Sequence, residues 1–137
     1  MTKDNILKIA TQEFSLYGYD AVSMNNLASK LQINKATIYY HYKDKKSLYQ
    51  SVLTKLIRQN KNRVKDLINT DLEPKEMFSQ YICLFIETIK ENPQIVPLIL
   101  REMANLGVNV EGSIEEDLEQ EILLLSSILA RLNLKEK

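Results

Sequence analysis

The chain has 137 residues, of which 45% are hydrophobic and 26% are charged, and its formal net charge is zero. This length allows one medium domain, or one small domain with a partial second. A single cysteine, Cys83, excludes an internal disulfide framework, and the apolar runs are too short to span a membrane. We therefore expect a soluble, cytoplasmic protein with no membrane partner.

Charge is distributed unevenly along the chain. Residues 1–65 hold twelve Lys or Arg against four acids, and residues 66–137 hold six against fourteen. The first part therefore has an excess of eight positive charges, and the second part has an excess of eight negative charges. A basic half attracts phosphate and favours a nucleic-acid partner, although zero net charge alone would argue against one. The alternative is that these charges are ordinary solvated helix surface.

The N-terminal third predicts three helices. Apolar residues at helical spacing predict a first helix from Lys3 to Tyr17, ended by Gly18. Ser23 and Asn34 are N-cap residues that predict the starts of two short helices, joined by a turn at Gln32. Two helices joined by a tight turn are the layout with which a protein places one helix in the major groove of DNA.

The third predicted helix has two faces. Ile38 and Tyr42, four residues apart, share the inward face, so they are assigned to the core. The outer side carries small and polar groups that suit a DNA groove. These are Lys35, Ala36, Thr37, Tyr39, Tyr40 and His41.

The segment Asn34–Lys45 (NKATIYYHYKDK), together with the preceding Tyr19–Met24 and Leu27-Ala28, resembles the N-terminal domain of the tetracycline-repressor (TetR) family of bacterial transcription regulators. The pattern spans roughly the first 50 residues. Gln32 stands where the family usually has a turn glycine, so we expect it in a left-handed conformation, and Tyr42 replaces a commoner phenylalanine. The resemblance implies an all-α fold, with a helix-turn-helix DNA-binding domain followed by a helical ligand-binding and dimerisation domain.

The resemblance also implies which residues contact DNA. Lys35 and Ala36 match base-reading positions, and Lys45 matches a phosphate-clamping lysine. Thr37 and Tyr40 are expected to contact a phosphate or the DNA groove, and Tyr39 and His41 are expected to contact the DNA backbone. The alternative for Tyr39 and Tyr40 is that one of the two rings packs on the protein core. The full predicted DNA-binding set is Ser23, Asn25, Asn34, Lys35, Ala36, Thr37, Tyr39, Tyr40, His41, Lys45 and Lys46.

For Ser23 and for the lysine pair Lys45 and Lys46, the sequence also allows an interpretation that does not involve DNA. Ser23 is equally suited to a cap alone. Lys45 and Lys46 fall in the first turn of a long helix, where the helix dipole disfavours cations. With DNA bound, these lysines and the free N–H groups of that turn become an anion site. A solvated lysine pair is the alternative.

The remaining chain predicts four more helices. Asp44 caps a long helix of about 45–69, which links a DNA-binding domain of residues 1–46 to a regulatory domain of residues 47–137. Further helices are expected over 75–92 and over 93–106, where Pro97 delays or kinks the start. A last helix follows the capping box Ser113–Glu116 and runs to about Leu132.

The second half offers candidate ligand-pocket residues: Met77, Phe78, Tyr81, Phe85, Met103 and Leu106. The alternative is ordinary core. The apolar run Ile122–Leu125, with Ile128, Leu129 and Leu132, requires a partner to cover it. Seven helices are fewer than the nine usual in the family, so we expect a short member or a truncated chain that lacks the last C-terminal helices.

The resemblance predicts a repressor that binds a near-palindromic double-stranded DNA operator as a homodimer and is released by a small hydrophobic ligand. The residues alone leave activation open. The alternative is an architectural or protein-partnered DNA-binding factor without an inducer. No cofactor, metal site or enzyme activity is expected, because the chain has no Gly-rich phosphate loop, no Cys/His metal spacing and only one histidine.

Overall fold

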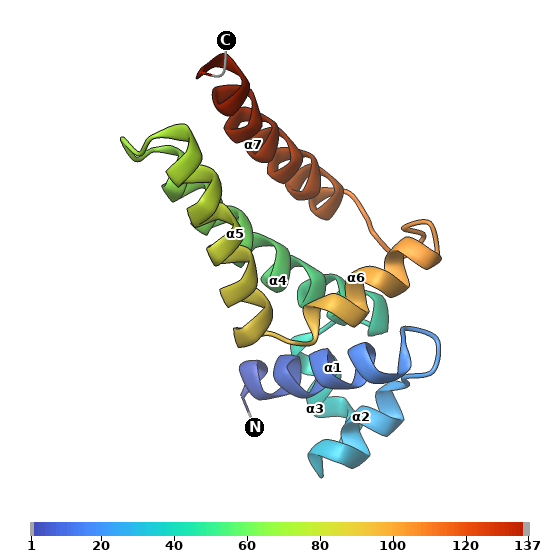
Figure 1. Cartoon of the computed structure of the whole chain (residues 1–137). Coiled ribbons are helices and arrows are strands. Elements are labelled where there is room, and N and C mark those ends of the chain that lie inside the picture. The colour runs from blue at the N-terminus through green and yellow to red at the C-terminus, as the bar shows by residue number, and fades with distance from the viewer. Residues whose placement is uncertain (1, 136–137) are drawn as a thin grey trace. The chain divides into compact units, whose positions relative to one another are not determined.

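The computed structural model describes residues 2–135, and this range contains seven α-helices and no strand (Figure 1). The predicted all-α fold is confirmed. The predicted domain ends at residues 1 and 137 lie outside the described residues. The helices are α1 (Lys3–Tyr17), α2 (Met24–Leu31), α3 (Lys35–His41), α4 (Lys45–Ile68), α5 (Pro74–Glu91), α6 (Ile95–Ala104) and α7 (Ser113–Lys135). No helix in this range is both long and apolar enough to cross a membrane.

The contacts divide the chain into two compact units. Unit 1 comprises Met1–Lys55 and Gln94–Glu111, and unit 2 comprises Leu56–Pro93 and Gly112–Lys137. The long helix α4 begins in unit 1 and ends in unit 2. This division differs from the predicted domains 1–46 and 47–137, because α6 joins the N-terminal helices.

Helix α6 belongs to unit 1 because it packs against α1 (Figure 1). Arg101 of α6 donates from Nε to the carbonyl of Ser15 at 3.3 Å and from Nη2 to the carbonyl of Leu16 at 2.7 Å. The last carbonyls of a helix have no partner within the helix, so a guanidinium at this end satisfies them. Leu98 places α6 in the apolar core as well, since its side chain is almost fully buried.

The core of unit 1 combines aliphatic side chains with an aromatic cluster. The rings of Phe14 and Tyr49 meet edge to face with centroids 4.9 Å apart, and Tyr19 lies 5.0 Å from Tyr49. Each such side chain, when fully buried, contributes about 1.5–3 kcal/mol. Phe14 and Tyr49 are almost fully buried, and so are the aliphatic side chains Ile6, Ala10, Leu27, Ile38, Leu48, Val52 and Leu98.

Unit 2 is built from the end of α4 with α5 and α7. Its core contains Val64, Leu67, Met77 and Ile128. Where α5 packs against α7, several apolar side chains of both helices stay exposed. The expected uncovered apolar run on α7 is therefore confirmed only in part, because Ile128 of that run is buried. The exposed ones are Ile82, Phe85, Ile86, Leu118, Ile122, Leu123 and Leu129.

Helix boundaries follow local chemistry closely. Gly18 ends α1 at φ +83°, and Pro74 occupies the first position of α5, where its missing N–H is harmless. Helix α6 starts at Ile95, so Pro97 lies in its first turn and the expected late start is confirmed. Helix α7 begins at Ser113 itself, one residue before the start that the capping box predicts.

Candidate nucleic-acid interface

The turn between α2 and α3 is held by backbone hydrogen bonds of the Schellman type. The N–H of Ile33 donates to the carbonyl of Ala28 at 3.0 Å, and the N–H of Gln32 donates to the carbonyl of Ser29 at 3.1 Å. Gln32 has φ +55° and ψ +42°, so the expected left-handed conformation is confirmed. The motif prefers glycine at this position, and an L-residue adopts the conformation at a cost. This turn fixes the path of the chain into α3.

Helix α3 separates a buried face from an exposed one, as the sequence predicts. Ile38 is fully buried, and Tyr42 is buried with its hydroxyl donating to the carbonyl of Lys3 at 3.5 Å. Burial raises the pKa of Tyr42, so this phenol stays protonated. Tyr40 is 84% exposed, so its ring does not pack on the core, whereas Tyr39 is only 45% exposed and its role stays a prediction.

The rest of the predicted α3 surface is available to solvent to different degrees. Lys35 and Ala36 are exposed, whereas Thr37 and His41 are half-buried. His41 meets the ring of Tyr40 edge to face, with centroids 5.1 Å apart. Tyr40 and His41 are thus the two members of the predicted set whose rings are in contact.

Three predicted contact residues surround the starts of α2 and α3. The hydroxyl of Ser23 accepts from the N–H of Asn26 at 3.0 Å, and the side chain of Asn34 accepts from the N–H of Ala36 at 3.0 Å. Both residues therefore act as N-caps. Asn25 is exposed in the first turn of α2. A role of Ser23, Asn25 or Asn34 at DNA stays a prediction.

Lys45 lies in the first turn of α4, over an aromatic ring. Its Nζ is 4.2 Å from the centroid of the Tyr19 ring. Burial lowers the pKa of Lys45, and the carboxylate of Asp20 partly offsets this effect. The position of the ammonium is therefore fixed by residues of the α1–α2 loop before any phosphate binds.

Lys46 is in a different situation, because it forms an ion pair with Glu111. The hydrogen bond to Glu111 raises the pKa of Lys46. The first turn of α4 is also less open to an anion than the sequence predicts: the N–H of Ser47 donates to the carboxylate of Asp44 at 2.7 Å. That bond lowers the pKa of Asp44. The expectation that the N–H groups of this turn are free is wrong for Ser47.

Sequence reasoning missed two residues of this surface, Tyr19 and Glu111. Tyr19 follows the helix-ending Gly18, and no spacing relates it to Lys45. Glu111 lies far along the chain from Lys46 and precedes α7. Neither pairing has a local signal, so only the fold reveals them.

The six predicted ligand-pocket residues fall in different surroundings. Met77 is part of the unit 2 core, and Phe78 and Tyr81 pack against that core, which is the alternative that the sequence left open. Phe85 is exposed on α5. Met103 and Leu106 belong to unit 1, where Leu106 is 91% exposed at φ +57° after the end of α6. A pocket shared by all six residues stays a prediction.

Comparison with known proteins relates the N-terminal part of the chain to a family of regulators. Residues 6–52 match the family described as bacterial regulatory proteins, tetR family. An uncharacterized HTH-type transcriptional regulator, YhgD, of Bacillus subtilis is 26% identical over 121 residues, which are 88% of this chain and 63% of YhgD. Residues 6–52 of the chain thus match the tetR family.

Two further comparisons separate similarity of sequence from similarity of fold. The negative transcriptional regulator IcaR of the biofilm operon icaADBC in Staphylococcus aureus is 40% identical, over 44% of this chain and 37% of IcaR. The ketosteroid transcriptional regulator KstR2 of Mycobacterium tuberculosis superposes with a TM-score of 0.83 at 19% identity, over 93% of this chain and 66% of KstR2. The chain thus spans less than two thirds of the length of YhgD and IcaR.

Proposed function

We propose that the protein is a transcriptional regulator that binds double-stranded DNA through α3 and holds the phosphate backbone through Lys45. The observation that carries the proposal is the division of α3: Ile38 and Tyr42 anchor it in the core, while Lys35, Ala36 and Tyr40 stay exposed. An anchored helix with an exposed polar face is suited to reading base edges in the major groove. The excess of basic residues in 1–65 supplies the attraction for phosphate.

A homodimer and repression are further parts of the proposal. The exposed apolar side chains of α5 and α7 form a surface that a partner would cover, and a second copy would place two α3 helices about 34–36 Å apart on a near-palindromic operator. Repression follows from the similarity to IcaR, which is a negative transcriptional regulator, and a location in the cytoplasm follows from DNA binding. Regulation rather than catalysis agrees with the relatives named above. Release by a small hydrophobic ligand rests on the family resemblance alone.

Footprinting tests the central proposal. The purified protein is applied to the DNA that flanks its own gene, and protection is compared with that of a shuffled duplex across several salt concentrations. We expect protection of a near-palindrome that weakens steeply as salt rises, because phosphate contacts release counterions. Equal protection of all sequences, or none at low salt, would refute sequence-specific regulation.

A thermal-shift screen with hydrophobic compounds tests the ligand. A compound present at 100 times its Kd adds about 2.7 kcal/mol to stability. A footprint without any stabilising compound would favour the architectural or protein-partnered factor.

A further inference from the structure

The α6–α7 loop, residues 105–111, is attached to the start of α4 by two polar contacts. Lys46 forms an ion pair with Glu111, and Nε2 of Gln50 donates to the carbonyl of Asn109. Lys46 and Gln50 are four residues apart, so they lie on the same face of α4. All four residues belong to unit 1. The loop therefore contacts the helix that carries the lysines of the predicted DNA surface.

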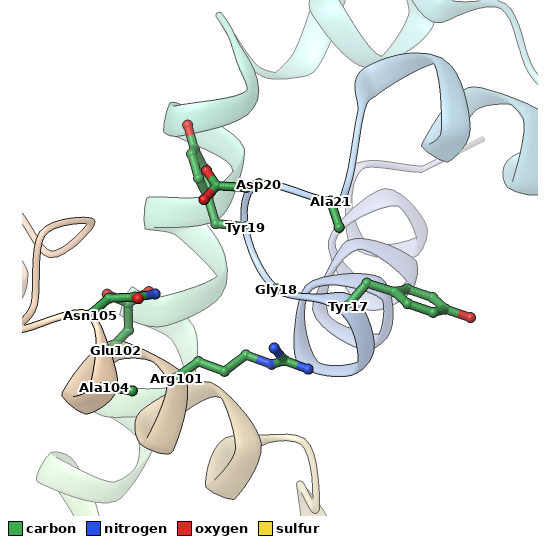
Figure 2. Close-up of a pocket in the computed structure, with 9 residues that line it drawn as sticks. All are labelled: Tyr17, Gly18, Tyr19, Asp20, Ala21, Arg101, Glu102, Ala104 and Asn105. Atoms are coloured by element: carbon green, nitrogen blue, oxygen red, sulfur yellow. The ribbon is translucent and has the colours of Figure 1, made fainter.

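Apolar packing does little to hold this loop in place. Leu106 and Val108 are 91% and 76% exposed. A hollow of about 280 Å³ beside Glu102 lies between Asn105, at the start of the loop, and Tyr19 (Figure 2). Little apolar burial is therefore lost when the loop moves, so its polar contacts with α4 largely define its position.

The two lysines in the first turn of α4 have different partners. The ammonium of Lys45 lies over the neutral ring of Tyr19. The ammonium of Lys46 meets the carboxylate of Glu111, and this hydrogen bond raises the pKa of Lys46. A carboxylate and a phosphate offer an ammonium group the same kind of charged oxygen acceptor. Of the two lysines, Lys46 is thus the one in an ion pair with a residue of the chain.

We propose that Glu111 takes the place of a DNA phosphate on Lys46 in the free protein, so that the α6–α7 loop weakens binding to DNA of any sequence. This inference rests on the proposed DNA-binding function and adds an autoinhibitory contact to it. A phosphate must displace Glu111 to reach Lys46, and a carboxylate that stays nearby repels the phosphate. Both side chains of the ion pair are about half exposed, and exposed pairs are weak enough for a phosphate to displace them.

Fluorescence anisotropy with Glu111→Gln tests the inference on two duplexes, the one protected in footprinting and a random one. The variant keeps the size of the side chain and removes its charge. We therefore expect the full chain to bind both duplexes roughly 1.5- to 5-fold more tightly at about 50 mM salt. The gain should be equal on the two duplexes, because phosphate contacts carry no sequence information. It should shrink at about 200 mM salt, because salt screens exposed charges.

A double-mutant cycle assigns the gain to the ion pair. In a chain that already carries Lys46→Ala, Glu111→Gln should no longer tighten binding, because the lysine for which the carboxylate competes is gone. Glu116→Gln makes the same charge change at an exposed position of α7 and should alter affinity far less than Glu111→Gln. No gain in Glu111→Gln, or an equal gain with and without Lys46, would overturn the inference.

A measurement without DNA checks the contact itself. The pKa of Lys46, followed by NMR of its side chain, should fall in Glu111→Gln because the hydrogen bond that raises it is lost. An unchanged pKa of Lys46 would also overturn the inference. The two proposals fail in different ways. If the unmodified chain bound no DNA, the proposed function would fail and this inference with it. If it bound DNA and Glu111→Gln bound no more tightly, only this inference would fail.

Discussion

Lys35→Ala and Lys45→Ala each remove one cation from the proposed DNA surface, and the structure predicts different consequences for the two. Lys35 is exposed at the start of α3, and among the described residues its side chain has no hydrogen bond or ion pair. A base contact there is worth about 1–3 kcal/mol of discrimination at one base pair. Since about 1.4 kcal/mol is a factor of ten, Lys35→Ala should weaken operator binding by roughly 5- to 150-fold per half-site and random duplex far less.

Lys45 should behave as a phosphate contact. Its ammonium is held over Tyr19, so it faces the same position whatever the DNA sequence. Losing one phosphate contact reduces the slope of log affinity against log salt by about 0.9. When the salt concentration rises fourfold, the affinity of both variants for DNA falls. The factor by which it falls should be roughly 3.5 times smaller for Lys45→Ala than for the unmodified chain, on operator and random duplex alike.

Fluorescence anisotropy with both duplexes, at several salt concentrations between about 50 and 200 mM, separates these effects. Lys75→Ala, an exposed lysine in the acidic part of the chain, is the control and should change neither quantity. Removing the Lys45–Tyr19 contact costs about 0.5–1 kcal/mol of stability, so thermal melts must show that the variant is folded. If Lys35→Ala and Lys45→Ala changed specificity and salt slope in the same way, the assigned roles would be wrong.

Three further predictions concern stability. Gln32→Gly removes the strain of the left-handed conformation, about 1–2 kcal/mol, but it stabilises the unfolded state by about 0.4–1 kcal/mol of chain entropy. Urea unfolding should therefore show a net gain in stability of about 0–1.5 kcal/mol. A clear loss of stability would contradict the strain argument. Ser23→Ala removes the N-cap of α2 and should cost about 0.5–2 kcal/mol in the same assay, and an unchanged midpoint would mean that the cap contributes nothing. Hydrogen bonds from Lys61 and Arg58 lower the pKa of Asp117, so its stabilisation is present above about pH 4 and is lost as pH falls through the lowered pKa. Asp117→Asn should thus destabilise the protein at neutral pH, with a difference that shrinks in acid; thermal melts across pH would refute this if the difference stayed constant.

The chain determines locally where its N-terminal helices begin and end. Ser23 and Asn34 are caps in the structure because a cap needs only a side-chain oxygen and an N–H two or three residues away. Ile38 and Tyr42 are buried because four residues return to the same face of a helix. The left-handed turn at Gln32 is equally local. The all-α fold and the composition of the α3 surface could therefore be predicted from the sequence.

Tertiary structure alone decided which distant residues meet. Arg101 satisfies the end of α1, Glu111 pairs with Lys46, and Tyr19 lies beneath Lys45. Helical periodicity says which side of a helix is apolar, but it does not say which element that side will contact. For the same reason α6 joins unit 1 rather than the second predicted domain, and the hollow beside Glu102 has no signature in the sequence. Such contacts depend on how helices pack in space, which short-range spacing does not encode.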